Sequence, residues 1–433
     1  MSLAHYACGS REHGLSRRQF LQRSGSTAVA GSAIAGGLGS LTTGLAAEQL
    51  KAQDMRIVVF NMHGGLSQLE SWDPKPGTKT GGPCRSIPTS VPGTHVSDLL
   101  PYTAKQMHHL CVLRGVNTSE DDHGKGAYMM LTGRRQTAAA EYPQIGAVAA
   151  RMLNDESRGL PGHIVVTPGG GGGKGNEAAY LGPKYSSISL GGSKPPPNTT
   201  KPDGMNDEAE LRRHDFRRRL NEEFLTRRRT AITDAYTHSY EQALRLMERR
   251  DVFDVSKEPQ ADQDRYGKHD LGRQCLMARR LLENGVSFVQ VTHSNYDTHN
   301  ENFNFHIEQL GEFDRAFATF ISDLFDRGML EKTLVVVLSE FGRTPNINLY
   351  YGRDHWSKAW SIVMAGGKVA RGAVFGKTND EGTEVVDGQV DHGALFHTYL
   401  QAVGVDSTQS IAVDGRELPI ADPAAAPVWK VLT

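Results

Sequence analysis

Residues 333–345, Thr-Leu-Val-Val-Val-Leu-Ser-Glu-Phe-Gly-Arg-Thr-Pro, predict a buried strand that ends in polar side chains. The first six residues are apolar or β-branched without polar alternation, which is typical of a strand covered on both faces. Ser339, Glu340 and Arg343 follow at once. Open sheets of parallel strands build their sites at the carboxyl ends of the strands, so we expect this junction to carry chemistry.

Similar apolar runs recur along the chain and alternate with helical patterns. We expect strands at 55–62, 109–116, 162–167, 285–292 and 360–365, and helices at 270–284, 306–327 and 395–403. Strands that alternate with helices indicate an α/β fold with a mainly parallel sheet. The expected architecture is a three-layer α/β/α sandwich.

Composition fits one large domain with insertions, or two domains, and we expect one domain over residues 51–433. The chain has 433 residues, 38% of them hydrophobic, and a formal net charge of −1. This length supports a large core, and the near-neutral charge gives no general attraction to nucleic acid. A Gly- and Pro-rich loop, including Gly169–Gly173, and a charged helical stretch predict an insertion at about 168–260. The Arg clusters of this stretch alternate with acids, which is typical of a solvated face or of a cap that contacts a polyanion.

The N-terminus matches an export signal. Ser16-Arg17-Arg18-Gln19-Phe20-Leu21 fits the twin-arginine pattern, and a weakly apolar stretch runs from there to the small residues near Ala47. We expect residues 1–50 to be a signal peptide and linker, recognised by the twin-arginine export machinery. The protein would then be periplasmic or extracellular, without a stable membrane span after cleavage. An uncleaved anchor is the alternative.

Histidines and acids gather at the expected strand ends. Asp297-Thr298-His299 and Gly352-Arg353-Asp354-His355-Trp356 stand near the segment quoted above, and His63 follows the first strand. Carboxylates and imidazoles together bind divalent metals. The candidate ligands are His63, Asp297, His299, Glu340, Asp354 and His355. They predict one or two ions, with zinc, manganese and calcium equally open; the alternative for any one histidine is a hydrogen-bonded structural role.

The order of these motifs resembles the alkaline phosphatase-like superfamily, which includes the sulfatases, over about residues 55–405. It is most similar to a secreted bacterial branch that is labelled only as a domain of unknown function and carries a twin-arginine signal. The segments that carry the resemblance are His63-Gly64-Gly65, Asp73-Pro74-Lys75-Pro76, His123 with Leu131-Thr132-Gly133, Asp297-Thr298-His299, Ser339 to Pro345 and Gly352 to Trp356.

The resemblance also implies roles for single residues. Counting back from Leu131-Thr132-Gly133, the sulfatase nucleophile position falls on His123, and the Arg of that motif falls on Ala127. Ordinary sulfatase chemistry therefore lacks its formylglycine precursor, and His123 is a ligand, a base or a nucleophile. From the residues alone, Arg343 and Arg353 flank the expected site and could hold an anion bidentately, and the alternative for each is a structural salt bridge. Arg343 is the candidate for holding the anion.

These observations predict an exported, metal-dependent hydrolase of phosphate or sulfate esters with the alkaline phosphatase-like fold. Its substrate would be an anionic small molecule or a polysaccharide ester. The alternative is a non-catalytic periplasmic binding or assembly protein with a degenerate sulfatase-like site. A phosphomutase-like enzyme would need a Ser nucleophile, for which the sequence offers no matching candidate.

Overall fold

The computed structural model describes residues 48–433 apart from 169–175, 193, 196–198, 201–203, 205, 228–230 and 414. The chain divides into two units, Met1–Ala52 and Gln53–Thr433. In the first, residues 48–52 are helical. The expected twin-arginine segment and the Gly169–Gly173 run lie outside the described residues. No helix in the described part of the chain is both long and apolar enough to cross a bilayer.

An eight-stranded sheet forms the centre of the second unit. In spatial order its strands are β12 (Ala373–Phe375), β4 (Leu110–Val116), β11 (Trp360–Ala365), β8 (Thr333–Leu338), β1 (Arg56–Met62), β7 (Phe288–His293), β5 (His163–Val166) and β6 (Ile188–Leu190). β11 runs antiparallel to both of its neighbours, and every other pairing is parallel. The sheet is therefore mainly parallel, as predicted.

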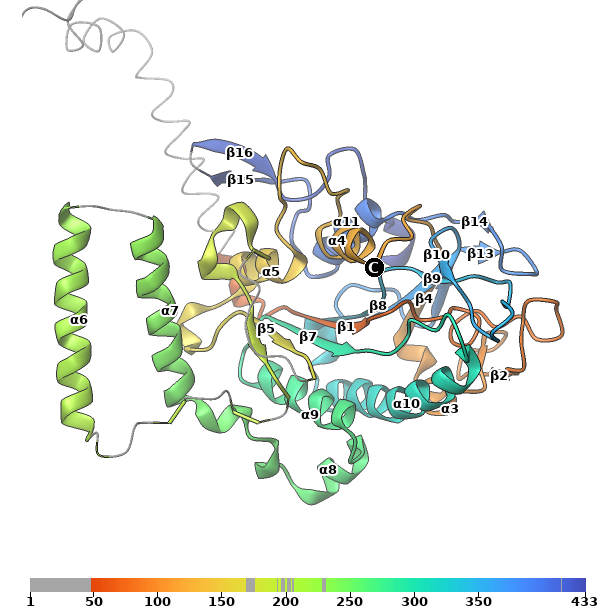
Figure 1. Ribbon diagram of the computed structural model, residues 1–433, viewed down its shortest axis with the longest axis horizontal. Helices are drawn as coiled ribbons and strands as arrows, with labels where there is room; N and C mark the ends of the chain where they lie inside the picture. Colours follow the sequence, from red (N-terminus) through yellow and green to blue (C-terminus); the bar gives the residue numbers. More distant parts are fainter. Residues whose placement is uncertain are drawn as a thin grey trace, which may run out of the picture. The chain divides into compact units, whose positions relative to one another are not determined.

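Helices cover both faces of this sheet (Figure 1). On one side lie α3 (Pro101–Lys105), α9 (Asp270–Glu283) and α10 (Asn302–Asp326), with α8 (Gln260–Tyr266) beyond them; on the other lie α4 (His123–Thr132), α5 (Ile145–Leu153) and α11 (His392–Ala402). Phe60 of β1 meets Phe313, Phe317 and Phe320 of α10 edge-on, with ring centroids 5.3–6.3 Å apart. The three-layer α/β/α architecture is confirmed.

Smaller elements decorate this framework. Four two-stranded sheets pair β2 (Ser86–Pro88) with β3 (His95–Ser97), β9 (Gly342–Arg343) with β10 (His355–Trp356), β13 (Lys377–Thr378) with β14 (Val385–Asp387), and β15 (Ser410–Val413) with β16 (Arg416–Pro419). The β9–β10 pair matters most here, because it joins the end of the segment that follows β8 to the segment that carries His355.

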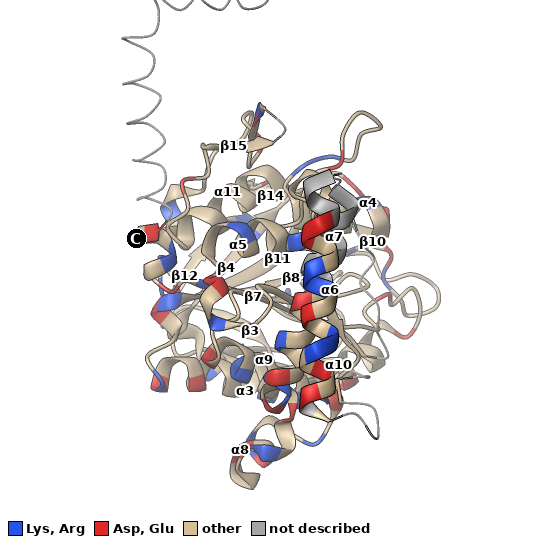
Figure 2. Cartoon of the chain, turned by 90° about the vertical axis from the view of Figure 1, so that its left-hand side faces the viewer, with Lys and Arg blue, Asp and Glu red and all other residues tan. Residues whose placement is uncertain are grey.

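The charged stretch forms two helices, α6 (Asp207–Arg227) and α7 (Ala231–Glu248). Figure 2 shows basic and acidic residues mixed along α6. Arg212 pairs with Glu208, and Arg218 pairs with Asp215, within the helix itself. This internal neutralisation agrees with the expected solvated face.

Two features differ from the expectations. β6 lies within the segment expected to be a long loop, and its three residues are too few to show a periodicity. The antiparallel direction of β11 was also not foreseen, since a fully buried apolar run has the same pattern in either direction.

Candidate metal centre

The candidate site lies at one edge of the sheet, where three adjacent strands end. The segment after β1 carries His63, that after β8 carries Glu340, and that after β7 carries Asp297, and these strands lie in the order β8-β1-β7. His123 is the first residue of α4, and His355 begins β10. Parallel strands end at a common edge, which explains why residues so far apart in sequence meet.

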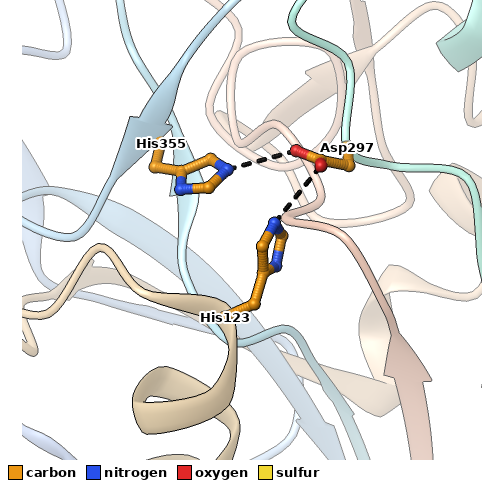
Figure 3. Close-up of side chains that lie close together, drawn as sticks. All are labelled: His123, Asp297 and His355. Atoms are coloured by element: carbon orange, nitrogen blue, oxygen red, sulfur yellow. Dashed lines mark hydrogen bonds and ion pairs between the residues drawn. The ribbon is translucent and has the colours of Figure 1, made fainter.

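Asp297 is the hub of the centre. Its Oδ1 lies 3.1 Å from Nε2 of His355 and 3.1 Å from Nε2 of His299, and its Oδ2 lies 3.3 Å from Nε2 of His123. Figure 3 shows His123 and His355 approaching the carboxylate from different directions. Tetrahedral bonds of about 2.0–2.1 Å to zinc place ligand atoms about 3.3 Å apart. The observed spacing therefore fits a set of metal ligands.

The hydrogen bonds of the three imidazoles fix which nitrogens face inward. Nδ1 of His123 contacts Glu340 Oε1 at 2.7 Å, Nδ1 of His299 contacts Asp354 Oδ1 at 2.7 Å, and Nδ1 of His355 contacts a backbone carbonyl, that of Asp121, at 2.7 Å. Carboxylate and carbonyl oxygens only accept here, so each Nδ1 carries the proton. In the neutral rings, every Nε2 then presents a lone pair toward Asp297.

Convergent acceptors of this kind need a cation between them. The Nε2 atoms of His299 and His355 are only 3.0 Å apart, and both face the same carboxylate oxygen. Such an arrangement is satisfied by a bound metal or by second protons on the rings. The ligand atoms of His123, Asp297 and His355 lie within 4.8 Å of one another. The structure thus contains a possible metal site, and these residues fit a divalent ion.

The charge and the exposure of these side chains suit a metal ion that enters from solvent. Asp297, His299 and Asp354 are exposed, whereas Glu340 is buried. Burial opposes ionisation of Asp297, but the hydrogen bond and charge of Arg343, with the bond to His355, lower the pKa of its carboxyl to about 2. Asp297 is therefore an anion throughout the physiological range.

Arg343 lies behind this hub and is fully buried. It donates a hydrogen bond to Asp297 Oδ1 at 2.6 Å and another to the carbonyl of Gly65 at 3.0 Å. It also donates to the carbonyls of Gly64 and Arg353. Burial lowers its pKa, and the pairing with Asp297 opposes that shift. The structure thus places Arg343 where it orients Asp297, and its expected contact with a substrate anion stays a prediction.

Glu340 lies behind His123, a candidate ligand. Besides His123, its Oε1 accepts the backbone N–H of Gly64 at 2.8 Å. Its neighbour Ser339 donates to the carbonyl of Met62 at 2.6 Å and accepts the N–H of Gly65 at 3.1 Å. Carboxylates of this kind orient ligand histidines and set their tautomer. Asp354 has the same relation to His299.

His63 lies beside the cluster rather than in it. Its side chain is exposed, and its ring lies nearly parallel to that of His123, with centroids 6.1 Å apart and an interplanar angle of 18°. The structure thus brings His123, Asp297, His299 and His355 together directly, supports two of them with Glu340 and Asp354, and leaves His63 at the open side.

Arg353 forms a structural salt bridge, which was the alternative to anion binding for this residue. Arg353 and Glu70 form an ion pair at 2.8 Å, with both side chains 0% exposed, and Asn302 donates to the same Glu70 at 2.9 Å. Arg353 also donates to the carbonyl of Thr344 at 3.1 Å. The pair fixes the segment that carries His355. The spacing of Glu70 and Arg353 in sequence gives no signal of this contact.

Comparison with solved structures finds low-scoring likenesses. The lipoteichoic acid synthase LtaP from Listeria monocytogenes has 6% identity and a TM-score of 0.39, covering 85% of this chain and 75% of that one. PsFucS1 sulfatase from Pseudoalteromonas sp. has 13% identity and a TM-score of 0.39, and the match covers 83% of this chain and 72% of that one. Alkaline phosphatase from the Antarctic bacterium TAB5 has 14% identity and a TM-score of 0.36, and the match covers 81% of this chain and 98% of that one. Likenesses of this degree support no inference about reaction or substrate.

Sequence comparison is more specific about the family. No curated protein matches this chain. The family model described as "Protein of unknown function (DUF1501)" matches residues 54–432, which include the whole sheet and every residue of the candidate centre. The chain therefore belongs to the DUF1501 family.

Proposed function

We propose that this protein is a metal-dependent hydrolase of phosphate or sulfate esters. The observation that carries the proposal is the convergence of three Nε2 lone pairs on one ionised carboxylate, Asp297, at 3.1–3.3 Å. His123, His299, Asp297 and His355 would hold the ion. With neutral rings and no metal, the Nε2 atoms would face Asp297 and one another as acceptors without a donor between them.

The chemistry follows from this ligand set. A divalent ion held here would polarise an ester oxygen and favour ionisation of a bound water. Arg343 keeps Asp297 ionised and aimed, and Glu340 keeps the proton of His123 on Nδ1. His63, exposed beside His123, is the candidate proton acceptor or additional ligand. Because both ring nitrogens of His123 face acids in this arrangement, a ligand role suits it better than a nucleophilic one.

One experiment tests the metal assignment directly. Elemental mass spectrometry of the purified protein should find about one equivalent of divalent metal, and His355→Ala and Asp297→Asn should lose most of it. His95→Ala, which removes an exposed histidine of β3, is the matched control and should keep the metal. Equal metal content in all four proteins would refute the ligand assignment. Hydrolysis of p-nitrophenyl phosphate and p-nitrophenyl sulfate by the metal-loaded protein then tests the reaction.

A binding or assembly protein is the second candidate. It is favoured by His123 at the position of the sulfatase nucleophile, and by the Arg343–Asp297 ion pair, which already neutralises the hub. Metal that binds to the four ligands without any ester turnover would support this candidate over the hydrolase.

We further propose that the chain is exported by the twin-arginine machinery, on the strength of Ser16-Arg17-Arg18-Gln19-Phe20-Leu21. Replacing Arg17 and Arg18 by Lys should retain the protein in the cytoplasm of an expressing bacterium, as cell fractionation would show. Unchanged export of this variant would contradict the proposal.

A further inference from the structure

Three consecutive large side chains stand in solvent beside the candidate centre. Leu349, Tyr350 and Tyr351 are 95%, 73% and 68% exposed. Apolar residues that are exposed singly are ordinary, but a contiguous exposed group marks a contact surface. We call Tyr350 and Tyr351, with Leu349 before them, the tyrosine platform.

The platform is held in place by its backbone. The carbonyls of Tyr350 and Tyr351 accept the N–H groups of Glu301 and Asn302 at 3.1 and 3.0 Å. Oδ1 of Asn348 accepts the N–H of Tyr350 at 3.0 Å and that of Gly352 at 2.9 Å. Tyr351 adopts a left-handed φ of 57°, which a non-glycine residue keeps only where its surroundings enforce it. The display of these rings is therefore built into the loop.

The same loop lies against the candidate centre. Nδ2 of Asn348 donates to the carbonyl of His299 at 2.9 Å and lies 3.4 Å from Oδ1 of Asp354. A Cβ added at Gly352 would meet the carbonyl oxygen of His299 at 1.9 Å, so the backbone of the loop touches that of a ligand. Arg353, Asp354 and His355 follow directly. The platform therefore stands at the rim of the site.

The side chains at the rim of the site favour one class of bound molecule over another. Tyrosine combines an apolar ring face with a polar tip, and the exposed amides of Asn300 and Asn346 flank the loop in sequence. A sugar ring has the matching character, with C–H groups on its faces and hydroxyls at its edges. An aliphatic chain would cover the amides without pairing them, which costs free energy.

We propose that the tyrosine platform binds the sugar ring of a sugar sulfate or sugar phosphate whose ester group lies at the candidate centre. The inference rests on the proposed hydrolase function and names its substrate class. Ring stacking on Tyr350 and Tyr351 would hold the alcohol side of the ester, while the centre holds the anion.

Direct binding tests this inference without relying on turnover. The probes are the 6-sulfates and 6-phosphates of galactose, glucose and N-acetylglucosamine, and their binding to the metal-loaded protein is measured by saturation-transfer NMR and by titration. Tyr350→Ala/Tyr351→Ala should raise the Kd of the bound probe about tenfold, and Tyr350→Phe/Tyr351→Phe should retain most of the affinity because the rings remain. Tyr102→Ala, at an exposed tyrosine of α3, is the matched control and should bind as the wild type does.

The outcomes separate this inference from the proposed function. Equal affinity in the wild type and the double Ala variant, or no saturation transfer from any probe, would overturn the platform. A change in oligomeric state of the double Ala variant with unchanged sugar binding would also overturn it and make the loop a protein contact. Weakened sugar binding in that variant would support the platform, even where His355→Ala leaves metal content unchanged and the hydrolase proposal fails.

Discussion

At the scale of single residues, the acids of the centre are of two kinds. Asp297 faces three imidazoles, whereas Glu340 and Asp354 each hold one imidazole from behind. In the proposed centre the first kind would contact the ion directly, and the second kind would orient the ligand histidines. Variants of the two kinds should therefore differ in how much metal affinity they lose.

We predict that Glu340→Gln weakens metal binding about 10- to 100-fold without abolishing it, because an amide is a poorer acceptor for the Nδ1–H of His123. Asp297→Asn should lose far more. Competition titration with a chromophoric chelator measures both affinities. Equal losses in the two variants would show that Glu340 is itself a ligand.

Sequence reasoning found most of the residues that converge at the centre, but not this division between inner and supporting groups. Asp297, His299 and His355 stand out because acids and histidines follow apolar runs. The pairing of His123 with Glu340 joins residues 217 positions apart, across α4 and the segment after β8. No local pattern encodes that contact, and nothing local shows that Arg343 is buried behind Asp297.

At the scale of elements, the turn after β1 is the most tightly constrained. Gly64 has a φ of 116°, and a Cβ there would lie 2.5 Å from the backbone N of Asp297. We predict that Gly64→Ala displaces the Asp297 loop, lowers the free energy of unfolding by more than about 2 kcal/mol and removes bound metal. Gly93→Ala is the control, since Gly93 also has a positive φ, 78°, but an added Cβ meets nothing within 4 Å.

For the control, strain alone predicts a loss of about 1 kcal/mol with metal content intact. Urea unfolding and elemental analysis of both variants provide the comparison. Similar losses of stability in the two would mean that the close approach to Asp297 is relieved by a small shift of the loop.

Helix α10 carries a histidine that ties stability to pH. His306 is fully buried, accepts the N–H of Ser67 at 3.1 Å and donates to the carbonyl of Asn302 at 2.8 Å, so it must be neutral. Burial lowers its pKa from 6.5 to about 4, although Glu70 opposes the shift. The unfolded chain then binds a proton that the folded chain does not, and stability is lost as pH falls from about 6.5 to 4.

We predict that this histidine contributes at most about 3 kcal/mol to the loss over that range. His306→Gln should flatten the pH dependence of the free energy of unfolding, measured with urea in the presence of a chelator. His95→Gln, at an exposed position, should leave the dependence unchanged. A wild-type slope that persists in His306→Gln would assign the effect elsewhere, for example to His163, whose pKa burial lowers to about 4.

Among the elements, the long buried strands are the ones that the sequence predicts well. The segments 333–338 and 360–365 match β8 and β11 because uninterrupted β-branched and apolar runs signal buried strands. The direction of β11 and the three-residue strands β6 and β12 were missed. Direction and very short pairings depend on neighbours that are distant in sequence.

At the scale of the whole molecule, an ion bound at the proposed centre would join α4, the segment after β7 and β10. Binding to the folded state alone raises stability, by about 2.7 kcal/mol when the free metal is 100 times its Kd. We predict that EDTA lowers the melting temperature of the wild type by a few degrees and has no effect on Asp297→Asn. An equal shift in the variant, by scanning fluorimetry, would place the stabilising ion elsewhere.

The long sequence separation within the centre also sets an order of events during synthesis. His355 is fixed by the carbonyl of Asp121, 234 residues earlier in the chain. A ribosome must therefore add all of these residues after Asp121 before the last candidate ligand, His355, is in the chain. Metal capture at the proposed centre would then report that the chain has closed correctly from Asp121 through His355, and under the proposed export this closure would precede transport of the folded protein.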